Sequence, residues 1–236
     1  MMTSPKIIAG NWKMNGTAAF LKECLSYWQG LDLIHDLVIC PPFTLLTEAN
    51  KNIHLSKVSL GAQDCHQKPL GAFTGNISAD QVKETGCSHV IIGHSERRQY
   101  HGENNDLVKV KAETAILSGL KPIICVGENL AEREQGSALE VLKNQIEECL
   151  PKSPEFLIAY EPVWAIGTGK AASLKDIEEV HSFLRILIGP YIPLLYGGSV
   201  TLENYKEILL TNNVDGVLVG GASLKKEDFG RMLCDQ

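Results

Sequence analysis

The chain has 236 residues, of which 44% are hydrophobic and 21% charged, a composition typical of a globular protein with a substantial core. Its formal net charge of -6 makes nucleic acid and anionic membrane surfaces poor partners, so an anionic ligand would need a local positive site. No apolar run is long enough to span a bilayer, and we expect no signal peptide. The seven cysteines are scattered and show no C-x-x-C spacing, which indicates reduced thiols in the cytoplasm.

Eight short apolar runs, rich in Ile, Val and Leu, recur along the chain. They do not alternate with polar residues, a pattern that predicts strands buried on both faces. The runs cover residues 6–10, 37–41, 58–62, 89–93, 122–126, 156–160, 193–196 and 216–220.

Amphipathic stretches between the runs predict helices, and Ser173 is expected to cap the start of one of them. Three apolar stripes mark the expected buried faces. They consist of Leu107, Val110, Thr114 and Leu117; of Leu139, Leu142, Ile146 and Leu150; and of Leu174, Ile177, Val180, Leu184 and Leu187.

Eight strand–helix units without a linker predict an α/β fold, a closed (β/α)8 barrel in a single domain over residues 1–236. A doubly wound open sheet would also alternate strands and helices. The count favours the barrel, because one helix follows each strand and no unit is left over.

The active site of such a barrel lies where the strands end, in the loops that lead to the helices. The residues in these positions should therefore converge on one mouth although they are far apart in sequence. They are Asn11, Lys13, His94, Ser95, Glu96 and Glu161, followed by "GGS" at 197–199 and "GGAS" at 220–223.

Paired glycines follow the last two strands, where phosphate sites of this architecture usually lie. Gly220 and Gly221 leave backbone N–H groups uncovered at the start of an expected helix, which favours an anion. Paired glycines can also be simple turns, but two such pairs in these two loops favour a phosphate site.

Glu161 is the best candidate for a general base. Apolar neighbours can exclude water around it, and desolvation is expected to raise its pKa. A carboxylate at a strand end can instead merely pair with a cation. The following residues, 162–170, resemble a lid that closes over a substrate, with Gly167 offering an N–H to the phosphate.

His94 and Lys13 supply candidate electrophiles. His94 stands where a short helix is expected to begin, and a helix N-terminus lowers the pKa of a histidine and leaves a neutral donor. Lys13 can stabilise a developing oxyanion, and Asn11 can position Lys13 or the substrate. Each residue could also have a purely structural role: His94 could be a structural histidine, Lys13 a solvated surface lysine and Asn11 a turn residue.

Three other motif readings fail. "GHSER" lacks the last glycine of a serine-hydrolase elbow, because Arg97 stands there. "GTGKAA" lies too far past its strand for a dinucleotide turn, and Trp164 stands where a P-loop would need its first glycine.

Six motifs, in order, make the chain resemble the triosephosphate isomerase family along nearly its whole length. They are "AGNWKMN" (9–15), "GAFTG" (71–75), "IIGHSERR" (91–98), "AYEPVWAIGTGK" (159–170), "YGGSV" (196–200) and "GVLVGGASL" (216–224). The resemblance implies a TIM barrel that interconverts dihydroxyacetone phosphate and D-glyceraldehyde 3-phosphate in glycolysis and gluconeogenesis, without a metal or an organic cofactor.

The resemblance also implies a role for each site residue. Glu161 would move the carbon-bound proton, His94 would act on the oxygens as a neutral electrophile, and Lys13 with Asn11 would stabilise the same charge. Ser95 and Glu96 would support these groups, with Ser95 holding Glu161 while the lid is open. The phosphate would bind backbone N–H groups of Gly167, Ser199, Gly220 and Gly221.

The family forms homodimers, so the resemblance implies that Phe73 and Thr74 enter a partner subunit near its active site. Two departures bear on this. Asn76 stands where many members have a glutamate that pairs with an arginine across the dimer, and the segment 170–196 is shorter than usual.

Two alternatives remain at this stage. One is another phosphate-binding barrel enzyme that acts on a larger substrate. The other is a catalytically silent barrel kept as a binding or scaffold protein, because fold alone does not fix function.

Overall fold

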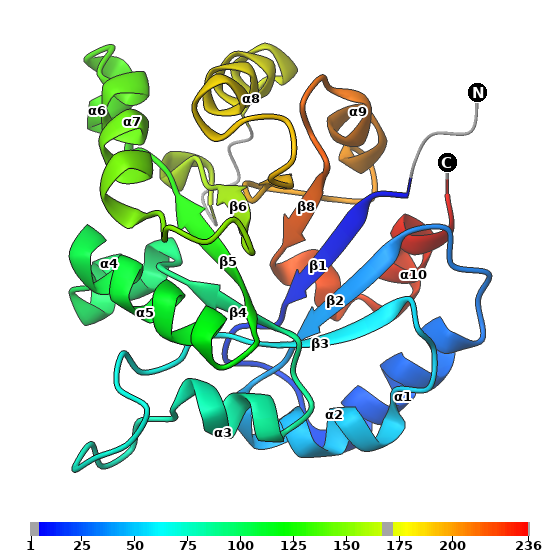
Figure 1. Cartoon of the computed structure of the whole chain (residues 1–236). Coiled ribbons are helices and arrows are strands. Elements are labelled where there is room, and N and C mark those ends of the chain that lie inside the picture. The colour runs from blue at the N-terminus through cyan, green and yellow to red at the C-terminus, as the bar shows by residue number, and fades with distance from the viewer. Residues whose placement is uncertain (1–4, 167–171, 236) are drawn as a thin grey trace.

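Eight parallel strands close into a barrel in which each strand pairs with its sequence neighbours and β1 pairs with β8 (Figure 1). The computed structural model describes residues 5–166 and 172–235. The barrel predicted from the eight apolar runs is confirmed, and the open sheet is excluded. The strands are β1 Ile7–Asn11, β2 Asp36–Cys40, β3 Val58–Ala62, β4 His89–Ile92, β5 Lys121–Val126, β6 Leu157–Tyr160, β7 Leu194–Tyr196 and β8 Gly216–Val219.

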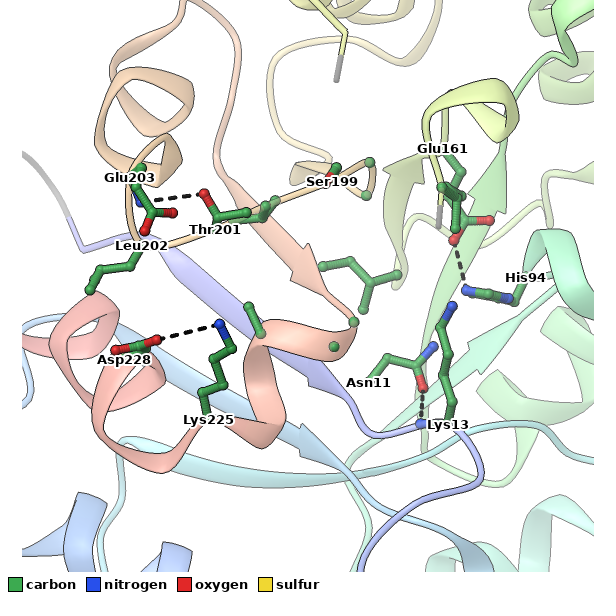
Figure 2. Close-up of a pocket in the computed structure, with 18 residues that line it drawn as sticks. Asn11, Lys13, His94, Glu161, Ser199, Thr201, Leu202, Glu203, Lys225 and Asp228 are labelled. Carbon is green, nitrogen blue, oxygen red and sulfur yellow. Dashed lines mark hydrogen bonds and ion pairs between the residues drawn. The ribbon is translucent and has the colours of Figure 1, made fainter. Parts of the chain in front are cut away.

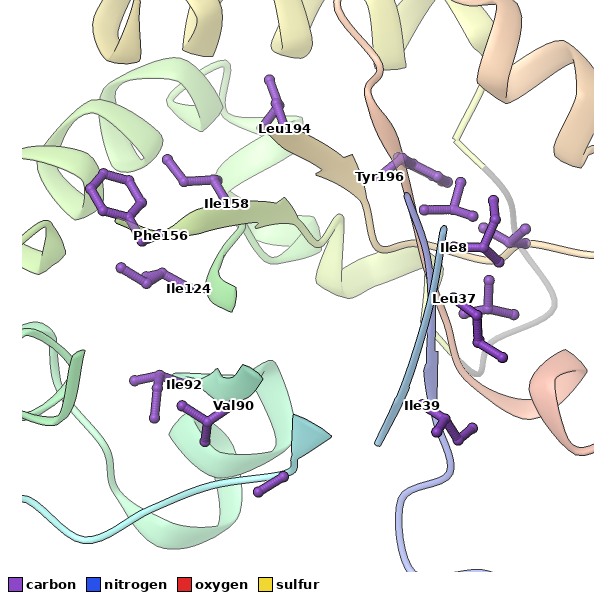
Figure 3. Packing of buried hydrophobic residues seen from close by; sticks show 14 of the residues in the cluster. Ile8, Leu37, Ile39, Val90, Ile92, Ile124, Phe156, Ile158, Leu194 and Tyr196 are labelled. Carbon is purple, nitrogen blue, oxygen red and sulfur yellow. The ribbon is translucent and has the colours of Figure 1, made fainter. Parts of the chain in front are cut away.

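The middle residues of the strands are mostly apolar because each strand contributes to two separate packing layers. On β1, Ile8 packs in the layer between the strands and the helices, whereas Ala9 packs inside the barrel. On β4 the same alternation places Ile92 outside and Ile91 inside. Figure 3 shows part of the outer layer. Burial on both faces explains why these runs show no polar alternation.

Helices surround the barrel (Figure 1), and both β4 and β5 are followed by two α-helices rather than the single one expected. Within the described residues, the α-helices are α1 Ala18–Gln29, α2 Leu46–Asn52, α3 Ala79–Glu84, α4 Ser95–His101, α5 Asn105–Leu117, α6 Leu130–Glu134, α7 Ala138–Cys149, α8 Leu174–Ile188, α9 Tyr205–Leu210 and α10 Lys226–Cys234. Short 3-10 helices cover η1 Phe43–Leu45, η2 Val163–Ala165 and η3 Gly221–Leu224. No helix in these ranges is both long enough and apolar enough to cross a membrane.

The predicted face of α5 is wrong. Leu117 is 88% exposed and Val110 is 43% exposed. The buried residues of this helix are instead Val108, Lys111, Ala112 and Ala115. The physical reason is Lys111, which is buried because its ammonium pairs with two carboxylates, a condition that a hydrophobic pattern does not reveal.

The stripe of α7 is placed correctly, with Leu139 and Leu150 at its ends partly buried against the core, whereas the stripe of α8 is correct at its centre and wrong at its ends. Leu142 and Ile146 of α7 and Ile177, Val180 and Leu184 of α8 are buried. Leu174 and Leu187 are 41% and 36% exposed at the two ends of α8. Ser173 caps this helix as predicted, since its side chain accepts a hydrogen bond from the N–H of Asp176.

Candidate active site

A cavity of about 320 Å³ opens where the strands end (Figure 2). The loops after β1, β4, β6, β7 and β8 all contribute to its wall. Its lining includes Asn11, Lys13, His94, Glu161, Ser199, Gly220 and Gly221. The barrel thus brings together side chains from five separate loops, and Ser95 and Glu96 stand directly behind them on α4.

Glu161 is buried, with 2% of its surface exposed, and two donors hold its carboxylate. The Ser95 N–H donates to Oε2 at 2.8 Å, and His94 Nε2 lies 3.0 Å from Oε1. Burial favours the neutral acid, but His94, the Ser95 N–H and Lys13 outweigh burial and lower the pKa of Glu161. The predicted rise in this pKa is therefore wrong for this arrangement, because both donors come from another loop, in which Ser95 lies 66 residues from Glu161 in the sequence.

His94 is the N-cap residue of α4, and its ring is oriented by the helix that follows. The backbone N–H of Glu96 donates to Nδ1 at 3.2 Å, so a proton on the neutral ring is carried by Nε2, which faces Glu161. Burial opposes the charged ring, but the Glu161 carboxylate outweighs burial and raises the pKa of His94. The lowered pKa predicted from the helix start is wrong while this contact persists.

Lys13 has a backbone φ of 52°, a left-handed conformation that is uncommon for a residue with a side chain. The Asn11 Oδ1 accepts a hydrogen bond from the Lys13 N–H at 3.0 Å, and the Lys13 ammonium lies 2.6 Å from Glu96 Oε1. Gln63, which the sequence did not single out, donates from Nε2 to the Lys13 carbonyl at 2.8 Å and to the Cys40 carbonyl at 2.9 Å. These contacts hold the ammonium at the cavity.

Gly220 and Gly221 also line the cavity, beside the Lys13 side chain, and a side-chain hydrogen bond holds the turn that they begin. The Ser223 hydroxyl donates to the Gly220 carbonyl at 2.7 Å, and neither glycine has a side chain of its own to cover its N–H group. A Cβ atom built on Gly220 would lie 3.9 Å from Lys13 Nζ. The element that follows is the short 3-10 helix η3 and not an α-helix, so the macrodipole contributes little here.

Glu128, at the end of β5, anchors the first part of the lid segment and was not recognised in the sequence. Its Oε1 accepts hydrogen bonds from the Trp164 indole at 2.9 Å and the Tyr160 hydroxyl at 3.1 Å. Its carbonyl accepts from the Val163 N–H at 3.0 Å. Nothing in the local pattern around Glu128 indicated this role, because its partners come from β6 and from the 3-10 helix η2 that follows it. Gly167 lies outside the described residues.

The segment 71–75 projects from the barrel. Phe73 at its tip is 40% exposed and packs against His66, with ring centroids 4.2 Å apart and the rings tilted by 42°. A second cavity of about 250 Å³ adjoins the active site. It is lined partly by Lys13, His94 and Glu96, and partly by Met14, which is 95% exposed.

A sequence model of the triosephosphate isomerase family matches residues 6–235, almost the whole of the chain. The chain belongs to the triosephosphate isomerase family. It is 48% identical to the triosephosphate isomerase of Ruegeria sp. (strain TM1040) over 97% of this chain and 96% of that protein. It is 47% identical to the one from Rhizobium meliloti (strain 1021) over 94% of this chain and 93% of that protein.

Solved structures agree with this family assignment. The crystal structure of triosephosphate isomerase from Bartonella henselae superposes with a TM-score of 0.89 at 43% identity, covering 96% of this chain and 97% of that one. The family resemblance and the TIM-barrel fold are therefore confirmed, and the chain is an isomerase. Membership of the triosephosphate isomerase family favours this reading over the silent scaffold and over an enzyme for a larger substrate.

Proposed function

We propose that this chain interconverts dihydroxyacetone phosphate and D-glyceraldehyde 3-phosphate by proton transfer through an enediolate. The observation that carries the proposal is the single cavity that Glu161, His94 and Lys13 line together with the glycine loops at 197–198 and 220–221. A base, an uncharged hydrogen-bond donor and a cation, together with backbone N–H groups that favour an anion, match a small phosphorylated carbonyl compound.

Glu161 is the base. It removes a proton from the carbon next to the carbonyl and returns the proton to the neighbouring carbon. Its resting contacts with Ser95 and His94 lower its pKa. When the carboxylate swings from these donors to the substrate carbon, burial remains and raises the pKa, which makes Glu161 a stronger base at the moment of transfer.

His94 and Lys13 stabilise the oxygens on which charge develops. The Nε2–H of His94 is released when Glu161 moves, and it then donates to the substrate oxygens. Without the Glu161 contact, burial and the Lys13 charge both lower the pKa of His94, which favours the neutral ring. Neutral imidazole as the electrophile is the arrangement for which this family is the standard example. The Lys13 ammonium, positioned by Asn11, offsets the enediolate charge.

The phosphate binds the N–H groups of Ser199, Gly220 and Gly221, with Gly167 as a further donor once the lid closes. Closure excludes water, which strengthens these interactions and protects the enediolate from losing phosphate. Two residues of α4 position the catalytic side chains. Glu96 holds Lys13 and His94, and Ser95 holds Glu161. No metal or organic cofactor is required by this chemistry.

The functional unit in this proposal is a cytoplasmic homodimer. Phe73 and Thr74 of one copy would enter the second cavity of the other, where exposed Met14 offers apolar surface beside Lys13 and His94. The seven cysteines are all free thiols, which supports a reducing compartment.

Isomerisation in D₂O tests this reaction path. Starting from dihydroxyacetone phosphate, the proposal predicts D-glyceraldehyde 3-phosphate with deuterium on carbon 2, because the proton on Glu161 exchanges with solvent during transfer. Product formed at full rate with no carbon-bound deuterium would indicate direct hydride transfer and would contradict the role of Glu161. His94→Asn is the companion variant and should slow both directions while leaving the KM within about threefold, since the phosphate contacts remain.

A further inference from the structure

The cavity carries a cation that the proposed chemistry does not use. Lys225 follows η3 and lines the same cavity as Gly220 and Gly221 (Figure 2). Its backbone N–H donates to the Ala222 carbonyl at 3.1 Å, which fixes the residue to the glycine turn. Its side chain is 72% exposed and therefore stands at the solvent side of the cavity.

The charges around the cavity leave Lys225 less neutralised than Lys13. The Lys13 ammonium lies 2.6 Å from Glu96 Oε1, whereas the Lys225 ammonium lies 3.9 Å from Asp228 Oδ2. Among the described residues that line this cavity, these two lysines are the cations, and Glu161, Glu203 and Asp228 are the anions. Lys225 is thus the cation that the outer part of the cavity presents to an arriving anion.

The overall charge makes such a residue useful. A chain with a formal net charge of -6 repels a phosphate dianion at long range, and two carboxylates stand at the outer part of the cavity. A cation beside these carboxylates offsets their repulsion of the phosphate within roughly one Debye length, about 8 Å at physiological ionic strength. Concave, low-dielectric walls focus that field toward the site and raise the encounter rate.

We infer that Lys225 is the residue that steers the substrate phosphate into the site, and that it acts on association and not on proton transfer. The inference rests on the proposed function, because it takes the ligand to be a phosphate dianion. It assigns a role in phosphate recognition to a side chain, in addition to the backbone N–H groups of the glycine loops. For an enzyme limited by encounter with its substrate, such a residue contributes directly to kcat/KM.

The test compares Lys225→Gln with Lys152→Gln, which removes the same charge from an exposed position near the start of β6, at the opposite end of the barrel. Measured with D-glyceraldehyde 3-phosphate at about 10 mM ionic strength, K225Q should lower kcat/KM by roughly three- to tenfold with kcat unchanged. The difference should shrink below about twofold at 0.5 M salt. K152Q should stay within about 1.5-fold of wild type throughout. Asp228→Asn, which frees Lys225 of its partner, should raise kcat/KM at low salt.

Two further readings separate steering from other effects. Inhibition by inorganic phosphate should weaken in K225Q and not in K152Q, and turnover of unphosphorylated D-glyceraldehyde should be the same in both variants. Equal kcat/KM values for K225Q and K152Q in an active enzyme would overturn the inference. So would a fall in kcat that persists at high salt, or equal slowing with D-glyceraldehyde. A wild-type chain without isomerase activity would instead overturn the proposed function on which the inference rests.

Discussion

Replacing Glu161 with aspartate tests how closely the base must be placed. The substitution keeps the charge but removes one methylene, which draws the carboxylate back by roughly 1 Å. The resting contacts of 2.8 Å to the Ser95 N–H and 3.0 Å to His94 Nε2 would lengthen to about 3.8–4.0 Å, past the usual hydrogen-bond limit of about 3.2 Å. The same shortfall applies to the substrate carbon when the side chain swings toward it.

Misplacement of this size costs about 10²-fold in kcat, equivalent to about 2.7 kcal/mol of transition-state stabilisation. The KM should stay within about threefold of wild type, because the phosphate loops are untouched. Steady-state isomerase assays in both directions measure these quantities, with Glu155→Asp as the matched change at an exposed carboxylate. A kcat for E161D within threefold of wild type would refute the assignment of Glu161 as the base.

Further predictions concern the oxyanion site, acid stability and assembly. Lys13→Ala should cost at least about 10²-fold in kcat with unchanged circular dichroism, and an active variant would remove Lys13 from its role. Burial lowers the pKa of His181 from 6.5 to about 4, so the unfolded chain binds a proton between these values and the native chain does not. The contribution of this residue to the free energy of unfolding is therefore complete above pH 6.5 and is lost as the pH falls toward 4. Between pH 7.5 and 5 the wild type should lose roughly 2 kcal/mol more of its free energy of unfolding than His181→Gln, as measured by urea unfolding. Equal losses in the two proteins would contradict the account. Sedimentation at micromolar protein should show a dimer that Phe73→Glu dissociates, and a wild-type chain that is active as a monomer would refute the proposed docking of the loop.

The barrel was predictable because its signal is repeated and local. Each of the eight strands is a short run of β-branched and aliphatic residues buried on both faces, and such runs need no information from distant parts of the chain. The α5 helix shows where this reasoning fails. Lys111 reads as a surface residue, yet Asp64, at 2.7 Å, and Glu103, at 2.6 Å, make it a core residue. Leu107 and Val110 took its place in the predicted face because they are apolar, not because they are buried.

The site was predictable in its membership but not in its electrostatics. Glu161 and His94 stand out because each directly follows a buried strand, and parallel strands of a barrel end at the same face. Their pKa values depend on a 3.0 Å contact between them and on the Ser95 N–H, which connect two loops far apart in the sequence. Gln63 and Glu128 were missed for the same reason, since their partners are carbonyls and side chains of segments far away in the sequence.

The most direct test of the central claim is the isomerase activity of the wild type and of Glu161→Gln, measured side by side on D-glyceraldehyde 3-phosphate. Glutamine keeps the size of the side chain and removes its negative charge and its ability to take a proton. We predict a wild-type kcat/KM that approaches the diffusional ceiling of about 10⁸ M⁻¹s⁻¹, for which this family is a standard example, and its collapse in the variant. A folded wild type that does not turn over this substrate, or a variant that retains its activity, would contradict the account.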